Sequence, residues 1–300
     1  MYELNRTAAR VIFKDLLGQA NHFLITILVG LNGVRAGRIT LDPEFSTSWN
    51  PKDVKASADR SRQFALDLAL IRAVDALDAY MMRTRRRPLA LTNDDFASRM
   101  DATGQKISRR LDVFSDFLKP LEAERAAFLR LAIDWRNQRV HSLAEDNLRS
   151  DDVKTIREQS EKLRNDFSGL GADEIIRNYQ AGIGPNFKEA AAVIRLAHQT
   201  VEHFDRELLQ GMDVINYIGE SLYVLLAHDR SHSKVEASCQ KIWGNQAKRQ
   251  AKVLRTLRLV GVTETSKLSG REIPADFVDA LLDMTPQSAF TFLSSVPQST

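Results

Sequence analysis

A short segment near the middle of the chain carries side chains suited to phosphate chemistry. Residues 134–141 read Asp-Trp-Arg-Asn-Gln-Arg-Val-His, which places two arginines, an asparagine and a histidine close together. Arginine offers a fixed charge and a fork of donors that matches a phosphate, and histidine can exchange a proton near neutral pH. Asparagine can orient either group because its amide both donates and accepts hydrogen bonds. We therefore take Arg136, Asn137 and His141 as candidate catalytic residues for phosphodiester chemistry without a metal or another cofactor.

Helical geometry brings only part of this set together. On an uninterrupted helix, residues four apart share a face, so Asn137 and His141 would be neighbours. Arg136 would lie about 140° around the helix from His141. A second copy of the helix, packed face to face about a two-fold axis, would supply the missing arginine and histidine. The competing interpretation is a solvated helix face with an incidental histidine.

Two further groups could support the site. Arg139 is expected to act as a support or a substrate contact. Asp75 and Asp78 lie among apolar residues of another expected helix, where a carboxylate could orient the histidine or pair with Arg136 or Arg139. An ion pair with Arg72, or simple exposure, is the alternative for these carboxylates. Trp135 and Val140 are expected to anchor the segment in the core.

Composition favours an all-α protein. With 14 glycines and 8 prolines in 300 residues, helix breakers are scarce, and we identify no convincing strand. The length allows one large domain or two smaller ones. A net charge of +3 permits nucleic-acid binding without arguing for it. The single cysteine, Cys239, excludes an intrachain disulfide and a cysteine-rich metal site, and it fits a reduced, cytoplasmic setting.

No membrane segment is expected. The longest apolar run, residues 23–31, is shorter than the roughly 20 residues that cross a bilayer. The first residues lack the basic and apolar regions of a signal peptide. No group of histidine, cysteine and acidic residues has the spacing of a metal site, so no metal is expected either.

The apolar spacing divides the chain into a series of helices. They are predicted over residues 5–35, 57–83, 96–100, 105–119, 120–148, 150–167, 187–228, 234–259 and 275–284. The stretch Thr92-Asn93-Asp94-Asp95 is expected to cap the short third helix, and Gly211 to interrupt the helix over 187–228. Glycine-rich breaks at 168–171 and 182–185 predict two domains, residues 1–170 and residues 171–300.

Two basic clusters are open to two interpretations. Arg83, Arg85, Arg86 and Arg87 could follow an RNA backbone or simply form a charged helix end. A second set repeats every three to four residues on one expected helix and could face RNA or solvent. That set comprises Lys248, Arg249, Lys252, Arg255 and Arg258.

The central segment resembles a known signature. Arg136-Asn137 followed by His141 is similar to the Arg-(polar)-x4–6-His motif of the HEPN superfamily, which comprises all-helical ribonucleases and related RNA-associated proteins. The resemblance covers about residues 1–165 and implies one hairpin over 5–35 and 57–83 and another over 105–119 and 120–148. A loop with Trp49-Asn50-Pro51, followed by Ser57 and Arg60, resembles a bacterial defence-associated branch. The C-terminal part, whose role would be regulation or partner binding, resembles no family that we can name.

The resemblance implies an endoribonuclease that acts as a toxin or phage-defence effector. His141 would be the general acid or base, Arg136 would steady the phosphate, and Asn137 would orient the histidine or the scissile phosphate. Cleavage at a homodimer interface would leave a 2′,3′-cyclic phosphate or 3′-phosphate and a 5′-hydroxyl. Expected partners are RNA, a second copy and a regulatory protein or antitoxin. The alternative is a non-catalytic RNA-binding module or scaffold with the same fold.

The chain departs from one branch of that superfamily. Some members carry a tyrosine two residues after the histidine, and a nucleotidyltransferase antitoxin modifies it. Leu143 stands at that position here, so silencing by this route is not expected.

Overall fold

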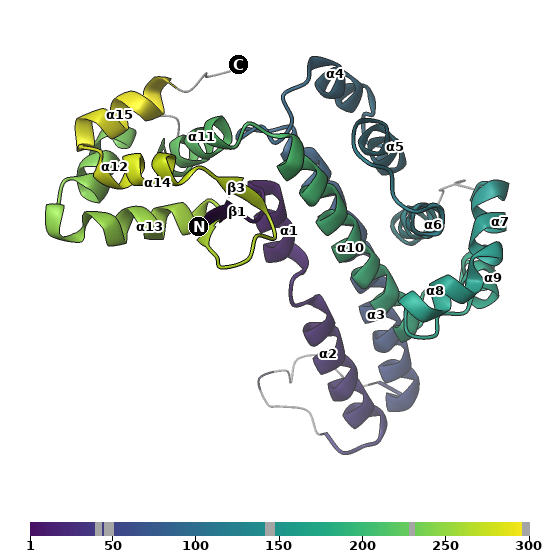
Figure 1. Cartoon of the computed structure of the whole chain (residues 1–300). Coiled ribbons are helices and arrows are strands. Elements are labelled where there is room, and N and C mark those ends of the chain that lie inside the picture. The colour runs from purple at the N-terminus through teal and green to yellow at the C-terminus, as the bar shows by residue number, and fades with distance from the viewer. Residues whose placement is uncertain (40–43, 45–50, 142–147, 228–231, 296–300) are drawn as a thin grey trace. The chain divides into compact units, whose positions relative to one another are not determined.

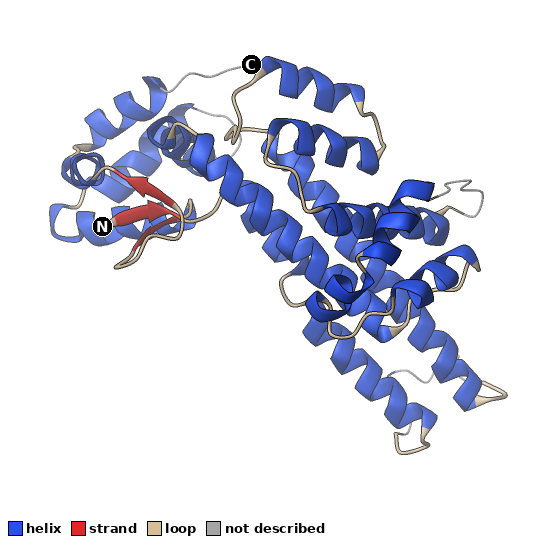
Figure 2. Ribbon diagram, turned by 45° about the vertical axis from the view of Figure 1, so that its right-hand side comes forward, coloured by secondary structure: helices blue, strands red, loops and turns tan. Residues whose placement is uncertain are grey.

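The structure, a computed structural model, describes residues 1–39, 44, 51–141, 148–227 and 232–295 (Figure 1). Helices make up most of these residues, which confirms the all-α class (Figure 2). One small three-stranded sheet is a feature that the sequence did not predict. Each of its strands has only three residues, too few for apolar alternation to be recognised. Trp49, Asn50 and Leu143 lie outside the described residues.

The chain forms two compact units, each assembled from separate segments. Unit 1 comprises residues 1–12, 79–120 and 201–300, and unit 2 comprises residues 13–78 and 121–200. These units differ from the predicted division at residue 170, because each takes residues from both sides of that point. Two long helices, α3 (Val54–Thr84) and α10 (Phe187–Gly211), supply residues to both units. Glycine-rich loops therefore do not mark where the units divide.

Unit 2 holds the candidate segment. Besides parts of α3, α10 and α1 (Ala8–Leu17), it contains α2 (Ala20–Arg35), α6 (Ala123–Val140), α7 (Ser150–Glu158), α8 (Ser160–Asp166) and α9 (Ala172–Gln180). Its core includes the ring pair of Phe128 and Phe167, whose centroids are 5.3 Å apart. Arg130 reinforces the packing of α6 beside α7, because its Nη2 lies 2.8 Å from a carboxylate oxygen of the buried Asp152.

Unit 1 contains the sheet and the C-terminal helices. Its elements are β1 (Tyr2–Leu4), α4 (Asp94–Ala102), α5 (Ile107–Phe117), α11 (Val214–Ala227), α12 (His232–Trp243), the 3₁₀ helix η2 (Gln246–Lys248), α13 (Arg249–Leu259), β2 (Val262–Glu264), β3 (Arg271–Ile273), α14 (Ala275–Asp283) and α15 (Pro286–Ser295). β1 pairs antiparallel with β2 on one side and β3 on the other.

A buried carboxylate ties the start of the chain to α10. Asp205 accepts hydrogen bonds from the backbone N–H and the hydroxyl of Thr7, at 3.2 and 2.5 Å. Burial raises the pKa of this carboxyl, although the bonds from Thr7 and the charge of Arg10 act in the opposite direction. The segment that leads from β1 into α1 is therefore held by long-range hydrogen bonds.

Several predicted helices prove to be shorter or divided. The helix expected over 5–35 is broken between α1 and α2, where a side chain on Gly18 would meet the Lys14 carbonyl oxygen at 2.5 Å. The helix over 150–167 becomes α7 and α8, and the one over 234–259 ends first at Trp243. Two other predictions are confirmed. Asn93 caps α4 by accepting a hydrogen bond from the Phe96 N–H at 2.9 Å, and α10 ends at Gly211.

Candidate functional site

Helix α6 positions the candidate residues, and Trp135 fixes that helix. The Trp135 side chain is fully buried, and its indole N–H donates to the Ile183 carbonyl oxygen at 3.0 Å. Its ring meets Tyr179 of α9 edge to face, with centroids 6.5 Å apart. The prediction that Trp135 anchors the segment is therefore confirmed, whereas Val140 is exposed and contributes little to the core.

Loss of this anchor should destabilise the protein strongly. Trp135→Ala is expected to lower the free energy of unfolding by about 3–5 kcal/mol, because it leaves a large cavity. Trp135→Phe should cost about 1–3 kcal/mol, because the Ile183 carbonyl loses its donor. Urea unfolding followed by circular dichroism measures both. Val140→Ala on the same helix is the control, expected within about 0.5 kcal/mol of wild type, and a Trp135→Ala value equal to it would contradict the anchoring role.

Arg136 is held by a carboxylate of α3. Its Nε and Nη2 both lie near Asp75 Oδ1, at 2.9 and 2.8 Å, and its Nη1 donates to Asn137 Oδ1 at 3.2 Å. The Arg136 side chain is 18% exposed and that of Asp75 is 44% exposed. Of the alternatives for Asp75, the structure thus contains the pair with Arg136, while the Arg72 Nε donates to the Leu16 carbonyl oxygen. Arg136, Asn137 and Asp75 form one connected group.

Arg139 has a separate, structural partner that the sequence did not reveal. Its Nη2 donates to Asp67 Oδ2 at 2.5 Å, and its Nη1 to the Gly182 carbonyl oxygen at 3.3 Å. Gln63 extends the group, since its amide donates both to Asp67 and to the Pro185 carbonyl oxygen. Arg139 therefore joins α6, α3 and the turn at 182–185. No local pattern in the sequence marks Asp67 as the partner, because the two residues lie 72 positions apart.

His141 lies at the exposed end of α6. The helix ends at Val140, and His141 is its C-cap with extended backbone angles of φ −116° and ψ 106°. The helix predicted to continue to residue 148 is therefore wrong at this point, and the shared helix face assumed for Asn137 and His141 ends here. Their backbones remain linked, because the His141 N–H donates to the Asn137 carbonyl oxygen at 2.8 Å. Within the described part of the chain, the imidazole has no hydrogen-bond or ion-pair partner.

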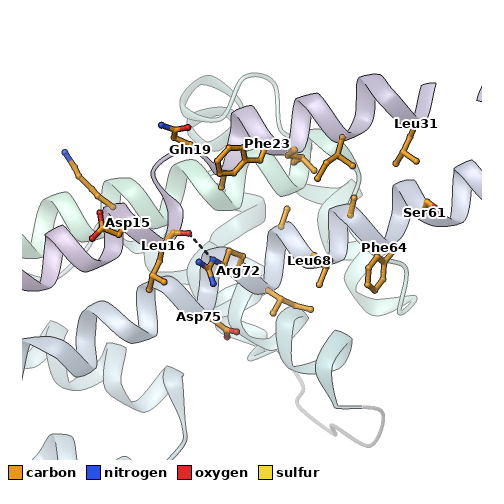
Figure 3. A pocket seen from close by; sticks show the side chains of 17 residues that line it. Asp15, Leu16, Gln19, Phe23, Leu31, Ser61, Phe64, Leu68, Arg72 and Asp75 are labelled. Carbon is orange, nitrogen blue, oxygen red and sulfur yellow. Dashed lines mark hydrogen bonds between the residues drawn. The ribbon is translucent and has the colours of Figure 1, made fainter. Parts of the chain in front are cut away.

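An open apolar groove of about 1050 Å³ runs between α2 and α3 (Figure 3). One end of it reaches Asp75, which belongs to the connected group of Arg136, Asn137 and Asp75. Leu31 and Ser61 lie toward one end, and Arg72 and Asp75 toward the other. The groove is lined mainly by apolar side chains, namely Leu16, Ala20, Phe23, Leu24, Ile27, Leu31, Phe64, Ala65, Leu68, Ala69 and Ile71. Because Asp75 both lines the groove and holds Arg136, any occupant of this end would lie beside the candidate residues.

Large apolar side chains in this groove are unusually exposed. Phe23 is 61% exposed and Phe64 is 65% exposed, and Ile27 and Leu68 are also exposed. Contiguous exposed apolar surface commonly marks a site of association. Their helical spacing predicted the helices correctly, but the face that it defines is not covered by the rest of the described chain.

One apolar stretch satisfies a simple test for a membrane span. Residues Ala8–Arg35 are long and apolar enough, by length and composition alone, to cross a membrane. Of the 18 most apolar consecutive residues in this stretch, 22% are buried. The structure divides this stretch into α1 and α2, with Lys14 and Asp15 among the residues that line the groove.

Comparisons of the chain with protein-family models, with curated proteins and with solved structures found no match.

Proposed function

We propose that the protein is a metal-independent endoribonuclease of the HEPN kind that acts as a homodimer, as a toxin or phage-defence effector. The observation that carries the proposal is the junction between the candidate residues and the groove. Asp75 lies at the end of the apolar groove and holds Arg136, which is five residues before the exposed His141. A second copy seated in the groove would therefore bring its own candidate residues near the first set.

Arg136 is suited to bind the scissile phosphate. Its contacts with Asp75 and Asn137 hold the guanidinium in one geometry before substrate arrives. A guanidinium has five N–H donors, so donors remain for phosphate oxygens after these contacts are made. Negative charge that builds on those oxygens in the transition state would be stabilised by this preorganised cation. Asn137 would keep the arginine in place.

His141 is suited to move the proton. It would take the proton of the ribose 2′-hydroxyl while the 2′-oxygen forms a bond to phosphorus. The bond from phosphorus to the 5′-oxygen breaks, and the leaving oxygen takes a proton from the second histidine of the dimer or from water. The products are a 2′,3′-cyclic phosphate and a 5′-hydroxyl. An exposed imidazole at a helix end can reach a bound substrate without rearrangement of the core.

The groove supports a second copy of the chain as its occupant. Two such faces related by a two-fold axis would cover each other's exposed apolar side chains. One end of the groove carries both signs of charge, from Lys14, Arg72, Asp15 and Asp75. A polar rim with both signs around an apolar centre is typical of a protein interface.

The direct test compares wild type with His141→Ala on total RNA in EDTA. Wild type is expected to cleave and to leave cyclic-phosphate ends, while the variant falls to background, because loss of a general acid–base group typically lowers the rate by about 10²–10⁴-fold. His203→Ala is the matched control, because the ring of His203 bonds to the Lys119 carbonyl oxygen and contacts Phe204, both outside the proposed site. Equal cleavage by wild type and His141→Ala would contradict the role of His141. If none of the three proteins cleaves RNA, the result would contradict the nuclease and favour the alternative, a non-catalytic RNA-binding module or scaffold.

A further inference from the structure

Helix α13 and its approach carry a run of positive charge without compensating acids. No acidic residue occurs between Glu236 and Glu264, whereas six basic residues do. They are Lys241, Lys248, Arg249, Lys252, Arg255 and Arg258. The whole chain has a net charge of only +3, so this segment concentrates positive charge that acidic residues balance elsewhere.

The helix separates its apolar and basic sides. Val253 and Leu257 are 1% exposed and pack into unit 1. Arg255 and Arg258 are exposed on the other side, and Lys248, just before the helix, is exposed as well. At 1.5 Å of rise per residue, the part of α13 from Arg249 to Arg258 extends about 14 Å. We call Lys248, Lys252, Arg255 and Arg258 the α13 basic row.

Some arginines elsewhere in unit 1 pair with carboxylates, whereas those of the basic row do not within the part of the chain that the structure describes. Arg85 pairs with Asp101, and Arg87 lies 3.4 Å from the buried Glu220, so two of the four arginines in the cluster at 83–87 are tied to carboxylates. On α13, Lys252 donates to the Lys241 carbonyl oxygen at 2.6 Å. Arg255 and Arg258 have no carboxylate partner among the residues that the structure describes. Their charge is therefore available to an external anion.

A polar hollow of about 460 Å³ adjoins the end of the basic row. It is lined by Arg258, Thr263, Glu264, Thr265 and Ser266. Hydroxyl groups commonly contact the phosphates and sugars of nucleic acids. The carboxylate of Glu264 would repel a phosphate, but it can accept a hydrogen bond from a ribose 2′-hydroxyl, the group by which proteins tell RNA from DNA. The composition of the hollow thus suits a ribose next to the phosphates along the helix.

We propose that the α13 basic row binds the sugar–phosphate backbone of single-stranded RNA, with the hollow receiving a ribose. A membrane surface fits less well, because a helix that lies on lipid inserts an apolar face, and Val253 and Leu257 of α13 are buried in the protein, with Leu259 at the helix end its only largely exposed leucine. The choice of RNA as the ligand rests on the proposed function, but binding can be measured without cleavage.

The test uses the full chain with His141→Ala, so that RNA stays intact. Binding to a fluorescent 20-nucleotide RNA of mixed sequence is followed by anisotropy from about 50 to 200 mM salt. Adding Arg255→Ala and Arg258→Ala is expected to weaken binding at least about 10-fold at the low salt, and to reduce the salt slope by about 0.7 for each lost phosphate contact. The DNA of the same sequence should bind more weakly than the RNA.

The matched control removes two cations from α7. Lys154 and Arg157 are exposed and pair with Glu158 and Asp173, at 3.8 and 3.1 Å. Their double alanine variant makes the same change in net charge and should bind RNA as before. Unchanged binding by the α13 variant, or equal weakening by the control, would overturn the proposal, as would a loss of binding to anionic vesicles without a loss of RNA binding. If wild type does not cleave RNA but only the α13 variant loses RNA binding, the proposed nuclease function is contradicted. RNA binding by the α13 basic row is then still supported.

Discussion

Phe23→Asp combined with Phe64→Asp is expected to leave the protein monomeric and to lower RNA cleavage to the level of His141→Ala. Both rings line the groove and are largely exposed in the single chain, so their replacement should scarcely change its folding. In a dimer they would be covered, and a buried, unpaired carboxylate is strongly unfavourable. Size-exclusion chromatography with light scattering measures the oligomeric state, and the EDTA assay on total RNA measures the activity.

Val29→Asp is the control for this variant. Val29 belongs to the same helix and is 64% exposed, but it does not line the groove. The control should remain dimeric and active, with circular dichroism showing unchanged helicity for both proteins. A double variant that stays dimeric and active would show that the groove is not the interface. A monomeric wild type would contradict the composite site. If wild type associates with lipid vesicles, and both the double variant and Val29→Asp abolish that association, α2 would instead be assigned to a membrane surface.

The groove shows what the spacing of apolar residues can predict about a helix and what it cannot. The spacing of Leu24, Ile27 and Leu28 predicts a helix, and the structure has one, but it buries Leu24 and Leu28 and leaves Ile27 exposed. Periodicity reports that a helix has an apolar side. It does not report whether that side is covered by the same chain or by another molecule. The helix was therefore predictable, and the groove was not.

The sequence predicted which side chains the candidate site contains better than it predicted their contacts. The sequence identified Arg136 and offered Asp75 as one of its partners, and the structure contains that ion pair. It did not identify Asp67, because an ion pair between residues 72 positions apart leaves no local pattern. Nor did it place the end of α6 at Val140, because no glycine or proline follows that residue closely. Local signals fix helices, whereas their ends and long-range pairs depend on packing.

Mixing Arg136→Ala with His141→Ala is expected to restore cleavage that neither variant shows alone. Asp75 directs Arg136 toward α3, while His141 lies beyond the end of α6, so we expect the arginine of one chain to act with the histidine of the other. Random exchange makes about half of the dimers mixed, and each mixed dimer keeps one of two productive pairs. The rate of the unseparated mixture should therefore approach about a quarter of the wild-type rate, and the rate of purified mixed dimers about a half.

The two variants are unfolded and refolded together, with a different tag on each, and the cleavage rate is measured on mixed dimers recovered through both tags. Arg136→Ala mixed with the double variant Arg136→Ala/His141→Ala is the control. It forms the same mixed dimers, but it has no arginine at this position in either chain, and it should stay inactive. Mixed dimers that are recovered intact yet remain as inactive as this control would mean that Arg136 and His141 act within one chain. The groove would then serve dimerisation without completing the site. Restoration would instead show that each active centre draws on both chains, and that covering the apolar face of α2 and α3 is a condition for catalysis as well as for association.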